Sequence, residues 1–333
     1  MIPRIQPAEH RPAWQEQLAS AVRSVDELLQ LLHIDPTTAA TPLLQHDFPL
    51  RVPHSFVQRM VHGDGQDPLL LQVLPVAEEL HEAAGFSSDP LGELGAMPSP
   101  GLLHKYPGRA LLTLTGACAV HCRYCFRRHF PYTDANPGSG HWQAAIDYLK
   151  KTPDVSELIL SGGDPLTLTD ARLYALTDRL KGINHLRTLR IHTRLPVVLP
   201  ARVDDGLITW IRSQTVRVVM VIHCNHPNEI DDSVIAALDK LGAAGATLLN
   251  QSVLLRNIND SVDTLEGLSH QLFDAGVLPY YLHQLDRVQG AAHFEVDIKH
   301  AREIESGLRA VLPGYLVPRL VQEVPGESGK TPL

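Results

Sequence analysis

The feature that most constrains this chain is a group of three cysteines, Cys118, Cys122 and Cys125, spaced as C-x3-C-x2-C. The apolar run at 110–115 precedes them and favours a β-strand, so the cysteines are predicted to lie on a loop that leaves the end of a strand. Three thiolates can hold three irons of a [4Fe–4S] cluster, and the fourth iron then has no protein ligand. An iron with an open position can bind a small molecule and pass it an electron. The sequence therefore predicts a redox-active cluster site.

Other interpretations of the cysteines stay open from the motif alone. A disulfide is disfavoured, because three cysteines do not pair off evenly and their spacing is tight. A zinc site that uses the three cysteines with His121 or His129 is the main alternative, and it would make the chain a zinc-stabilised binding module. Zinc knuckles seldom follow a buried strand in a long α/β chain, so the cluster is the favoured interpretation.

Composition narrows the class of protein. The chain has 333 residues, of which 44% are hydrophobic and 20% charged, as in a globular protein with one large domain or one domain and a smaller appendage. A net charge of -8 argues against a broad nucleic-acid footprint. The first residues lack the apolar core of a signal peptide, and no stretch is long enough to span a membrane. A clustered cysteine set suits a reducing compartment, so we expect a cytoplasmic protein.

The pattern along the chain predicts an α/β fold. Residues 1–95 read as a helical N-terminal region, with one helix over 14–32, and Pro-rich joints near 90 and 97–101 separate it from the rest. Residues 96–315 alternate between strands and helices, and residues 316–333 are expected to form a closing strand and a turn. Strands are predicted at 110–115, 157–161, 189–193, 216–222, 248–254, 278–282 and 316–324, and helices at 141–151, 170–181, 205–213, 233–244, 264–275 and 299–312. Six β/α units predict a parallel sheet rolled into a barrel or part of one.

Polar residues follow each of the first six predicted strands. After the cysteines come Gly162-Gly163-Asp164, then His192-Thr193-Arg194, then His223-Cys224-Asn225-His226, then Asn250-Gln251, and finally His283-Gln284-Leu285-Asp286. Barrels of this kind carry their chemistry in the loops after the strands. Any one of these residues fits a cap or a turn, and a loop histidine such as His223 or His226 fits a structural role. Polar groups that recur at the same end of six successive β/α units predict a shared active-site face.

The cysteine spacing, with Tyr124 before the last cysteine, resembles the radical S-adenosylmethionine (SAM) superfamily. Gly162-Gly163-Asp164-Pro165 resembles the motif with which that superfamily holds the methionyl amino group of SAM. Two glycines allow close approach of backbone to a ligand, although the same residues also describe a turn capped by Asp164. The resemblance implies a radical SAM partial (β/α)6 barrel with SAM as cofactor. It also implies that His223 and Gln251 face SAM or a second cofactor.

The region from 104 to the end resembles the lysine 2,3-aminomutase family. The matching segments are HKYPGR at 104–109, CFRR at 125–128, HCNHPNEI at 223–230, NQSVLLRNIND at 250–260, YYLHQLDRVQGAAHF at 280–294 and the Gly-Lys turn at 329–330. The resemblance covers about 230 residues, and the N-terminal helices match more loosely. It implies an isomerase that uses a [4Fe–4S] cluster, SAM and pyridoxal 5′-phosphate (PLP) to convert L-lysine to (R)-β-lysine.

The resemblance also implies a role for each matching residue. Lys330 would form the Schiff base with PLP, and Arg109, Lys105 and Tyr106 would lie at the PLP phosphate and ring. Arg127 would pair with the substrate carboxylate, which suits its two-pronged donor geometry. Asp286 and Glu323 would receive the far ammonium of lysine. A buried ammonium needs partners, so this pair of acids favours a diamino acid.

Two departures from the family pattern refine the expectation. Glu323 stands where the family has Asp, and the turn before Lys330 is Gly-Glu-Ser-Gly. The chain ends three residues after Lys330. This short form resembles the bacterial branch that makes (R)-β-lysine, which a separate ligase attaches to translation elongation factor P. An electron donor is also implied. The alternatives are an aminomutase of another amino acid, a catabolic lysine enzyme, or a radical SAM protein without PLP.

Overall fold

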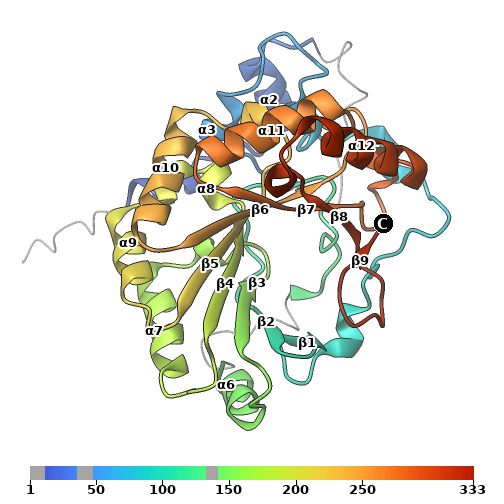
Figure 1. Ribbon diagram of the computed structural model, residues 1–333. Helices are drawn as coiled ribbons and strands as arrows, with labels where there is room; N and C mark the ends of the chain where they lie inside the picture. Colours follow the sequence, from blue (N-terminus) through green and yellow to red (C-terminus); the bar gives the residue numbers. More distant parts are fainter. Residues whose placement is uncertain (1–11, 36–47, 133–141) are drawn as a thin grey trace, which may run out of the picture.

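In a computed structural model that describes residues 12–35, 48–132 and 142–333, nine strands form one sheet in which spatial order follows chain order (Figure 1). The strands are β1 Leu102–Tyr106, β2 Arg109–Thr113, β3 Glu157–Ser161, β4 Thr188–Thr193, β5 Arg217–Ile222, β6 Thr247–Val253, β7 Leu278–His283, β8 Arg319–Gln322 and β9 Thr331–Pro332. Strands β2 to β8 are parallel, while β1 and β9 pair antiparallel with their neighbours. The described strands form an open sheet that ends at β1 and β9, so the predicted partial barrel is correct.

The sequential order follows from the connections. A parallel neighbour requires a crossover, and a helix supplies one. The crossover helices lie on the outer face of the curved sheet (Figure 1). They are α6 Trp142–Lys151, α7 Asp170–Leu180, α9 Asp205–Arg212, α10 Asp232–Ala243, α11 Val262–Asp274 and α12 Ile298–Val311, with the short α8 Leu195–Val198 after β4. Side-chain caps mark several starts; Asp204, for example, accepts the backbone N–H of Leu207 at 2.9 Å. Each predicted helix overlaps an observed one, although His141 lies outside the described residues.

The predicted single helix over 14–32 is wrong. Two helices, α1 Ala13–Ala19 and α2 Val25–Leu31, flank a break at which Val22 forms an antiparallel bridge with Val52. The Val22 N–H donates to the Val52 carbonyl at 2.8 Å, and the Val52 N–H donates back at 3.0 Å. Ser24 then caps the second helix. A pairing with a residue thirty positions away therefore overrides a continuous helical pattern, and strand β1 was likewise not predicted.

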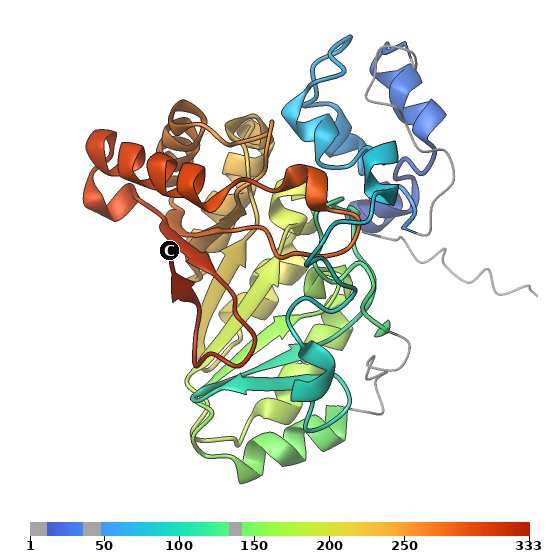
Figure 2. The ribbon, with the colours of Figure 1, turned by 90° about the vertical axis from the view of Figure 1, so that its right-hand side faces the viewer.

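The N-terminal region lies beside the carboxyl ends of the parallel strands (Figure 2). Its short helices α3 His54–Val57 and α4 Pro68–Leu71 are followed by the 3-10 turns η1 Ala77–Leu80 and η2 Glu93–Ala96. Ser55 donates its hydroxyl to the Val198 carbonyl at 2.7 Å, and Gln72 donates to the Glu229 carboxylate at 3.1 Å. Side chains of this region and of the sheet also share one hydrophobic cluster. The region therefore packs on the loops after β4 and β5. The division of the chain into regions 1–95, 96–315 and 316–333 stays a prediction.

Among the described helices, none has both the length and the apolar character that crossing a bilayer requires.

A buried ion cluster ties the N-terminal region to the cysteine loop. Glu79 in η1 accepts two hydrogen bonds from Arg123, at 2.7 and 2.5 Å, and one from Arg128 at 2.6 Å. The Arg123 and Glu79 side chains are almost fully buried, at 0% and 2% exposure. These arginines hold the pKa of Glu79 below its usual value, even though burial opposes that shift.

We predict that Glu79→Ala lowers the free energy of unfolding by about 3 kcal/mol, because it leaves Arg123 buried and unpaired. Urea unfolding of the cofactor-free protein, followed by circular dichroism, measures the change. The adjacent exposed Glu78 is the matched control, and Glu78→Ala should change stability by less than about 0.5 kcal/mol. Equal effects of the two substitutions would contradict the assigned role of Glu79.

Candidate active site

One cavity of about 400 Å³ opens at the carboxyl ends of the parallel strands. Every site residue predicted from the sequence lines it: Cys118, Cys122, Cys125, Gly162, Gly163, Asp164, His223, Gln251, Arg127, Asp286, Glu323, Lys105, Tyr106, Arg109 and Lys330. The shared face predicted from the strand ends is therefore present. Four residues of the polar set at the strand ends lie elsewhere. His226 caps a turn, Asn250 bonds the Cys224 backbone, Gln284 bonds the Val296 carbonyl, and Cys224 is buried in the hydrophobic core.

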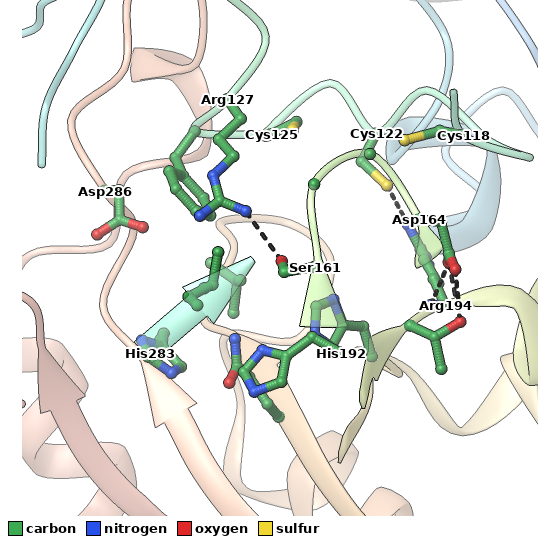
Figure 3. A pocket seen from close by; sticks show the side chains of 18 of the residues that line it. Cys118, Cys122, Cys125, Arg127, Ser161, Asp164, His192, Arg194, His283 and Asp286 are labelled. Atoms are coloured by element: carbon green, nitrogen blue, oxygen red, sulfur yellow. Dashed lines mark hydrogen bonds between the residues drawn. The ribbon is translucent and has the colours of Figure 1, made fainter. Parts of the chain in front are cut away.

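The three cysteines are free thiols at one end of the cavity (Figure 3). Burial and the neighbouring Cys125 raise the pKa of the Cys118 thiol well above its usual value, and burial and Cys122 raise that of Cys125 to about 11. All three cysteines line the same cavity, and three thiolates are the donor set that an iron–sulfur cluster takes. The residues present therefore fit a cluster.

The zinc alternative gains no support from the neighbouring histidines. The Nδ1 atom of His121 lies 2.7 Å from the Pro49 carbonyl, and its ring stacks on Phe48. His129 is exposed, with its Nε2 atom 3.2 Å from the Gln289 carbonyl. Within the described ranges, no three His, Cys, Asp or Glu side chains are arranged to hold a metal ion; this covers the three cysteines too, so it does not decide between zinc and a cluster.

A buried cation adjoins the cysteines. The Arg194 guanidinium donates to the Cys122 sulfur at 2.7 Å (Figure 3). It also donates to the Tyr124 hydroxyl at 2.7 Å and pairs with Glu229 at 3.0 Å. Gln72 accepts from the same guanidinium at 2.6 Å. Arg194 therefore fixes both a cysteine side chain and the aromatic ring of the loop.

Gly162 and Gly163 hold the cysteine loop against the end of β3. Gly162 has a φ of +122°, and a Cβ on Gly163 would lie 2.3 Å from the Ala117 carbonyl oxygen. The Gly163 N–H donates to the Thr115 carbonyl at 2.6 Å. A side chain at Gly163 would therefore push the cysteine loop away. These glycines are needed for the packing of the loop, whether or not they also contact SAM.

The Asp164 carboxylate is committed to the protein itself. It accepts hydrogen bonds from the Thr193 hydroxyl at 2.7 Å and from the backbone N–H groups of Leu166 and Arg194 at 3.0 and 2.7 Å. Burial raises its pKa to about 6 against these bonds. The cap that the sequence offered as the alternative is present, so a contact between this turn and SAM would use its backbone.

Three histidines at the strand ends face the cavity without partners. The Nε2 atoms of His192, His223 and His283 are buried and have no hydrogen-bond partner among the described residues. Burial and nearby cations, including Lys330, lower the pKa of His192 and His283 well below the usual value and that of His223 to about 4. They are therefore neutral at pH 7 and keep unused hydrogen-bonding capacity toward a ligand.

Lys330 is brought to the cavity by a short hairpin. Strand β9 pairs with β8 through Gln322 and Thr331, so the turn returns Lys330 to a position beside Glu323. Its ammonium lies 3.1 Å from the Glu323 carboxylate and 5.6 Å from the centre of the Tyr281 ring.

Arg109 is the best placed cation for a phosphate. Its guanidinium lies 4.6 Å from the centre of the Tyr106 ring, and no ion pair of Arg109 is found among the described residues. A Cβ on Gly329 would lie 3.9 Å from that guanidinium, so Arg109 adjoins the Lys330 turn. Lys105 is engaged elsewhere, with Leu91 O at 3.1 Å, Glu323 at 3.2 Å and Glu93 at 3.6 Å. Its assignment to a phosphate stays a prediction that these contacts do not favour.

The two predicted ammonium-binding acids differ in charge state. Lys330 and Lys105 hold the pKa of Glu323 at about 2, although burial opposes the shift. Burial and the charge of Glu323 raise the pKa of Asp286 to about 7, and no hydrogen bond to its carboxylate is found within the described part of the chain. Asp286 points into the cavity (Figure 3).

Arg127 is already paired. It donates to the Glu93 carboxylate through Nε at 2.7 Å and Nη2 at 2.8 Å, and to the Ser161 hydroxyl through Nη1 at 2.9 Å. Sequence reasoning missed Glu93, because it lies in a Pro-rich joint without a local signal. Ser161, His192, Arg194 and His283 lie at strand ends of the predicted active-site face, but the sequence assigned no role to them.

Comparison with known proteins finds close relatives along almost the whole chain. The chain is 50% identical to the L-lysine 2,3-aminomutase of Escherichia coli over 97% of this chain and 95% of that protein. It is 47% identical to that of Haemophilus influenzae over 96% of this chain and 94% of that protein. The identity to the enzyme of Clostridium subterminale is 36%, over 96% of this chain and 77% of that protein.

Two other comparisons add nothing to this result. No family model matches the chain. A radical SAM methyltransferase from Sphaerobacter thermophilus aligns with a TM-score of 0.48 at 18% identity, over 66% of this chain and 68% of that one, which is too little to support an argument.

We predict that Asp286→Asn makes the cofactor-free protein less sensitive to rising pH. The folded pKa of Asp286 is about 7, whereas an unfolded Asp titrates near about 3.9. Between these values the folded state binds more protons, so the carboxyl group lowers wild-type stability as pH rises through the window. Because this carboxyl faces the cavity, the variant should gain on the order of 1 kcal/mol over wild type between pH 5 and pH 8.

Urea midpoints at the two pH values measure this difference. Asp274→Asn, at an exposed position on α11, is the control and should show the wild-type pH dependence. A constant difference between Asp286→Asn and wild type at both pH values would rule out the raised pKa.

Proposed function

The chain belongs to the L-lysine 2,3-aminomutase family, and on that premise we propose that it converts L-lysine to (R)-β-lysine with PLP as a cofactor. Lysine 2,3-aminomutases are isomerases that use a [4Fe–4S] cluster, SAM and PLP. The observation that carries the proposal is that three free thiols, an amine on a hairpin and two acids line one cavity. A one-electron donor is also needed to reduce the cluster.

The residues at the two ends of the cavity suit two different cofactors. Cys118, Cys122 and Cys125 would hold the cluster, with His223, Gln251 and the backbone of the Gly162 turn toward SAM. Lys330 would bond to PLP, with Arg109 at its phosphate and Tyr106 at its ring. When bound, the cluster and SAM supply a 5′-deoxyadenosyl radical that removes hydrogen from the substrate, and PLP stabilises the migrating nitrogen.

The protein's own part is to orient the substrate and to exclude water. Arg127 would receive the α-carboxylate of lysine, while Asp286 and Glu323 would receive the far ammonium. In the present state Lys330 supplies one of the cations at Glu323, at 3.1 Å. When the substrate's α-amine takes the place of Lys330 on PLP, Lys330 would be released, and Glu323 would face its amine, Lys105 and the far ammonium of the substrate. Two carboxylates near an added ammonium favour a diamino acid over a neutral one.

The assay that tests this function is anaerobic incubation with L-lysine, SAM, PLP and a reductant, followed by mass spectrometry of derivatised products. Formation of β-lysine is the expected outcome. Product from another amino acid alone would assign a different substrate, and product without PLP would remove PLP from the proposal. A colourless, zinc-loaded protein would reject the radical mechanism.

We predict that Lys330→Ala reduces β-lysine formation to less than about 0.1% of wild type, because no other group would hold PLP covalently. Iron and sulfide content should stay at the wild-type level, since the contacts of Lys330 among the described residues are with Glu323 and Tyr281 and not with a cysteine. Borohydride should fix PLP to wild type and leave the variant unlabelled. Wild-type turnover by the variant would show that another lysine bonds PLP.

We further propose that the β-lysine serves the modification of translation elongation factor P by a separate ligase, in the cytoplasm. This proposal rests on the short form of the chain. The chain covers 95% and 94% of the E. coli and H. influenzae relatives, to which it is 50% and 47% identical, and 77% of the clostridial relative, to which it is 36% identical. The cytoplasmic location is supported by the reduced cysteines that a cluster requires.

Loss of the gene should remove the β-lysyl mass increment from elongation factor P isolated from the same cells. Added (R)-β-lysine should restore it, because only the supply of the amino acid is missing. An unchanged mass of elongation factor P in the deletion strain would count against this role and leave the aminomutase activity unaffected.

A further inference from the structure

We propose that Glu93 is a positioning residue that, together with Ser161, fixes the guanidinium of Arg127 in the orientation that receives the substrate's α-carboxylate. The inference rests on the proposed function, which places an amino acid in the cavity. Glu93 lies in η2, in the joint between the N-terminal region and β1, 34 residues before Arg127.

The contact between Glu93 and Arg127 has the geometry of a fixed pair. Nε donates to one carboxylate oxygen at 2.7 Å and Nη2 donates to the other at 2.8 Å, and each side chain is only 6% exposed. Two parallel charge-assisted bonds set both the plane and the direction of a guanidinium. Ser161, at the end of β3, adds a third bond at 2.9 Å from Nη1.

The donors of Arg127 are only partly used by these contacts. A guanidinium carries five N–H donors, and Glu93 and Ser161 take one each from Nε, Nη1 and Nη2. One N–H therefore remains on Nη1 and one on Nη2. The guanidinium points into the cavity between Ser161 and Asp286 (Figure 3). These remaining N–H groups can donate to a substrate carboxylate, so the substrate can bind without displacing Glu93.

Other contacts keep Glu93 in place. Lys105 lies 3.6 Å from the same carboxylate, so Glu93 is held by two cations. The Asp89 carboxylate accepts the backbone N–H of Glu93 at 3.0 Å and that of Leu94 at 3.4 Å, which fixes the turn that carries Glu93. Release of Glu93 would leave a buried carboxylate with a single cation, which is unfavourable. These contacts favour a Glu93 that stays paired with Arg127 when the substrate binds, and not a Glu93 that the substrate's carboxylate displaces.

The test is calorimetric titration of the PLP-loaded protein, without reductant and therefore without turnover, using L-lysine and L-lysinamide. The two ligands differ at the carboxylate, which lysinamide lacks. Glu93→Gln should weaken L-lysine binding about tenfold. Without the charged pair to Glu93, the Arg127 guanidinium is held loosely and donates less well to the substrate's carboxylate. The affinity for lysinamide should stay at the wild-type value.

Matched variants separate the outcomes. Glu327→Gln, at an exposed position of the C-terminal turn, should bind both ligands as wild type does. Ser161→Ala should weaken lysine binding in the same selective manner by a smaller factor, and it gives the answer if Glu93→Gln does not fold. Equal weakening of both ligands would mean a general structural role, and tighter lysine binding would mean that Glu93 competes with substrate; either result overturns the proposal. Absence of lysine binding by wild type would instead refute the proposed function.

Discussion

A row of alternating charges across the cavity connects parts of the chain that the sheet leaves apart. Arg127 pairs with Glu93, Glu93 lies near Lys105, and Lys105 pairs with Glu323, which also holds Lys330. Lys105 belongs to β1, at one end of the open sheet, and Glu323 follows β8, near the other end. Side-chain ion pairs therefore join the two ends where backbone ladders do not. The groups that hold the fold together at this place are the same groups that the proposed chemistry needs.

The histidines complement this row of charges. His192, His223 and His283 lie among the cations of the cavity and are kept neutral by burial and by Lys330. Neutral rings add hydrogen-bonding atoms without adding positive charge to a site that already holds Arg109, Arg127 and Lys330. The cavity thus offers both charged groups and uncharged polar atoms, a combination suited to a zwitterionic substrate.

The sequence predicts the parts of this structure that local patterns determine. Strands β2 to β8 and their helices follow from period and spacing, and the cysteine loop follows from its position after β2. The Val22–Val52 bridge and the contact of Glu93 with Arg127 were not predictable, because each joins segments with no shared local pattern. Asp164 illustrates a third case, since the same residues fit a helix cap and a ligand turn, and only the structure shows that its carboxylate is used by the cap.

The close contact at Gly163 separates two properties of the site. The distance between the cysteine loop and the turn after β3 is set by main-chain atoms, with Gly163 N–H on Thr115 O and Asp164 N–H on Ala117 O. Every residue except proline carries the same main-chain donor and acceptor, so substitutions other than proline at neighbouring exposed positions of the loop leave this spacing unchanged. Homologous chains can therefore differ in reactivity through their side chains alone, while the main-chain spacing of the site stays the same.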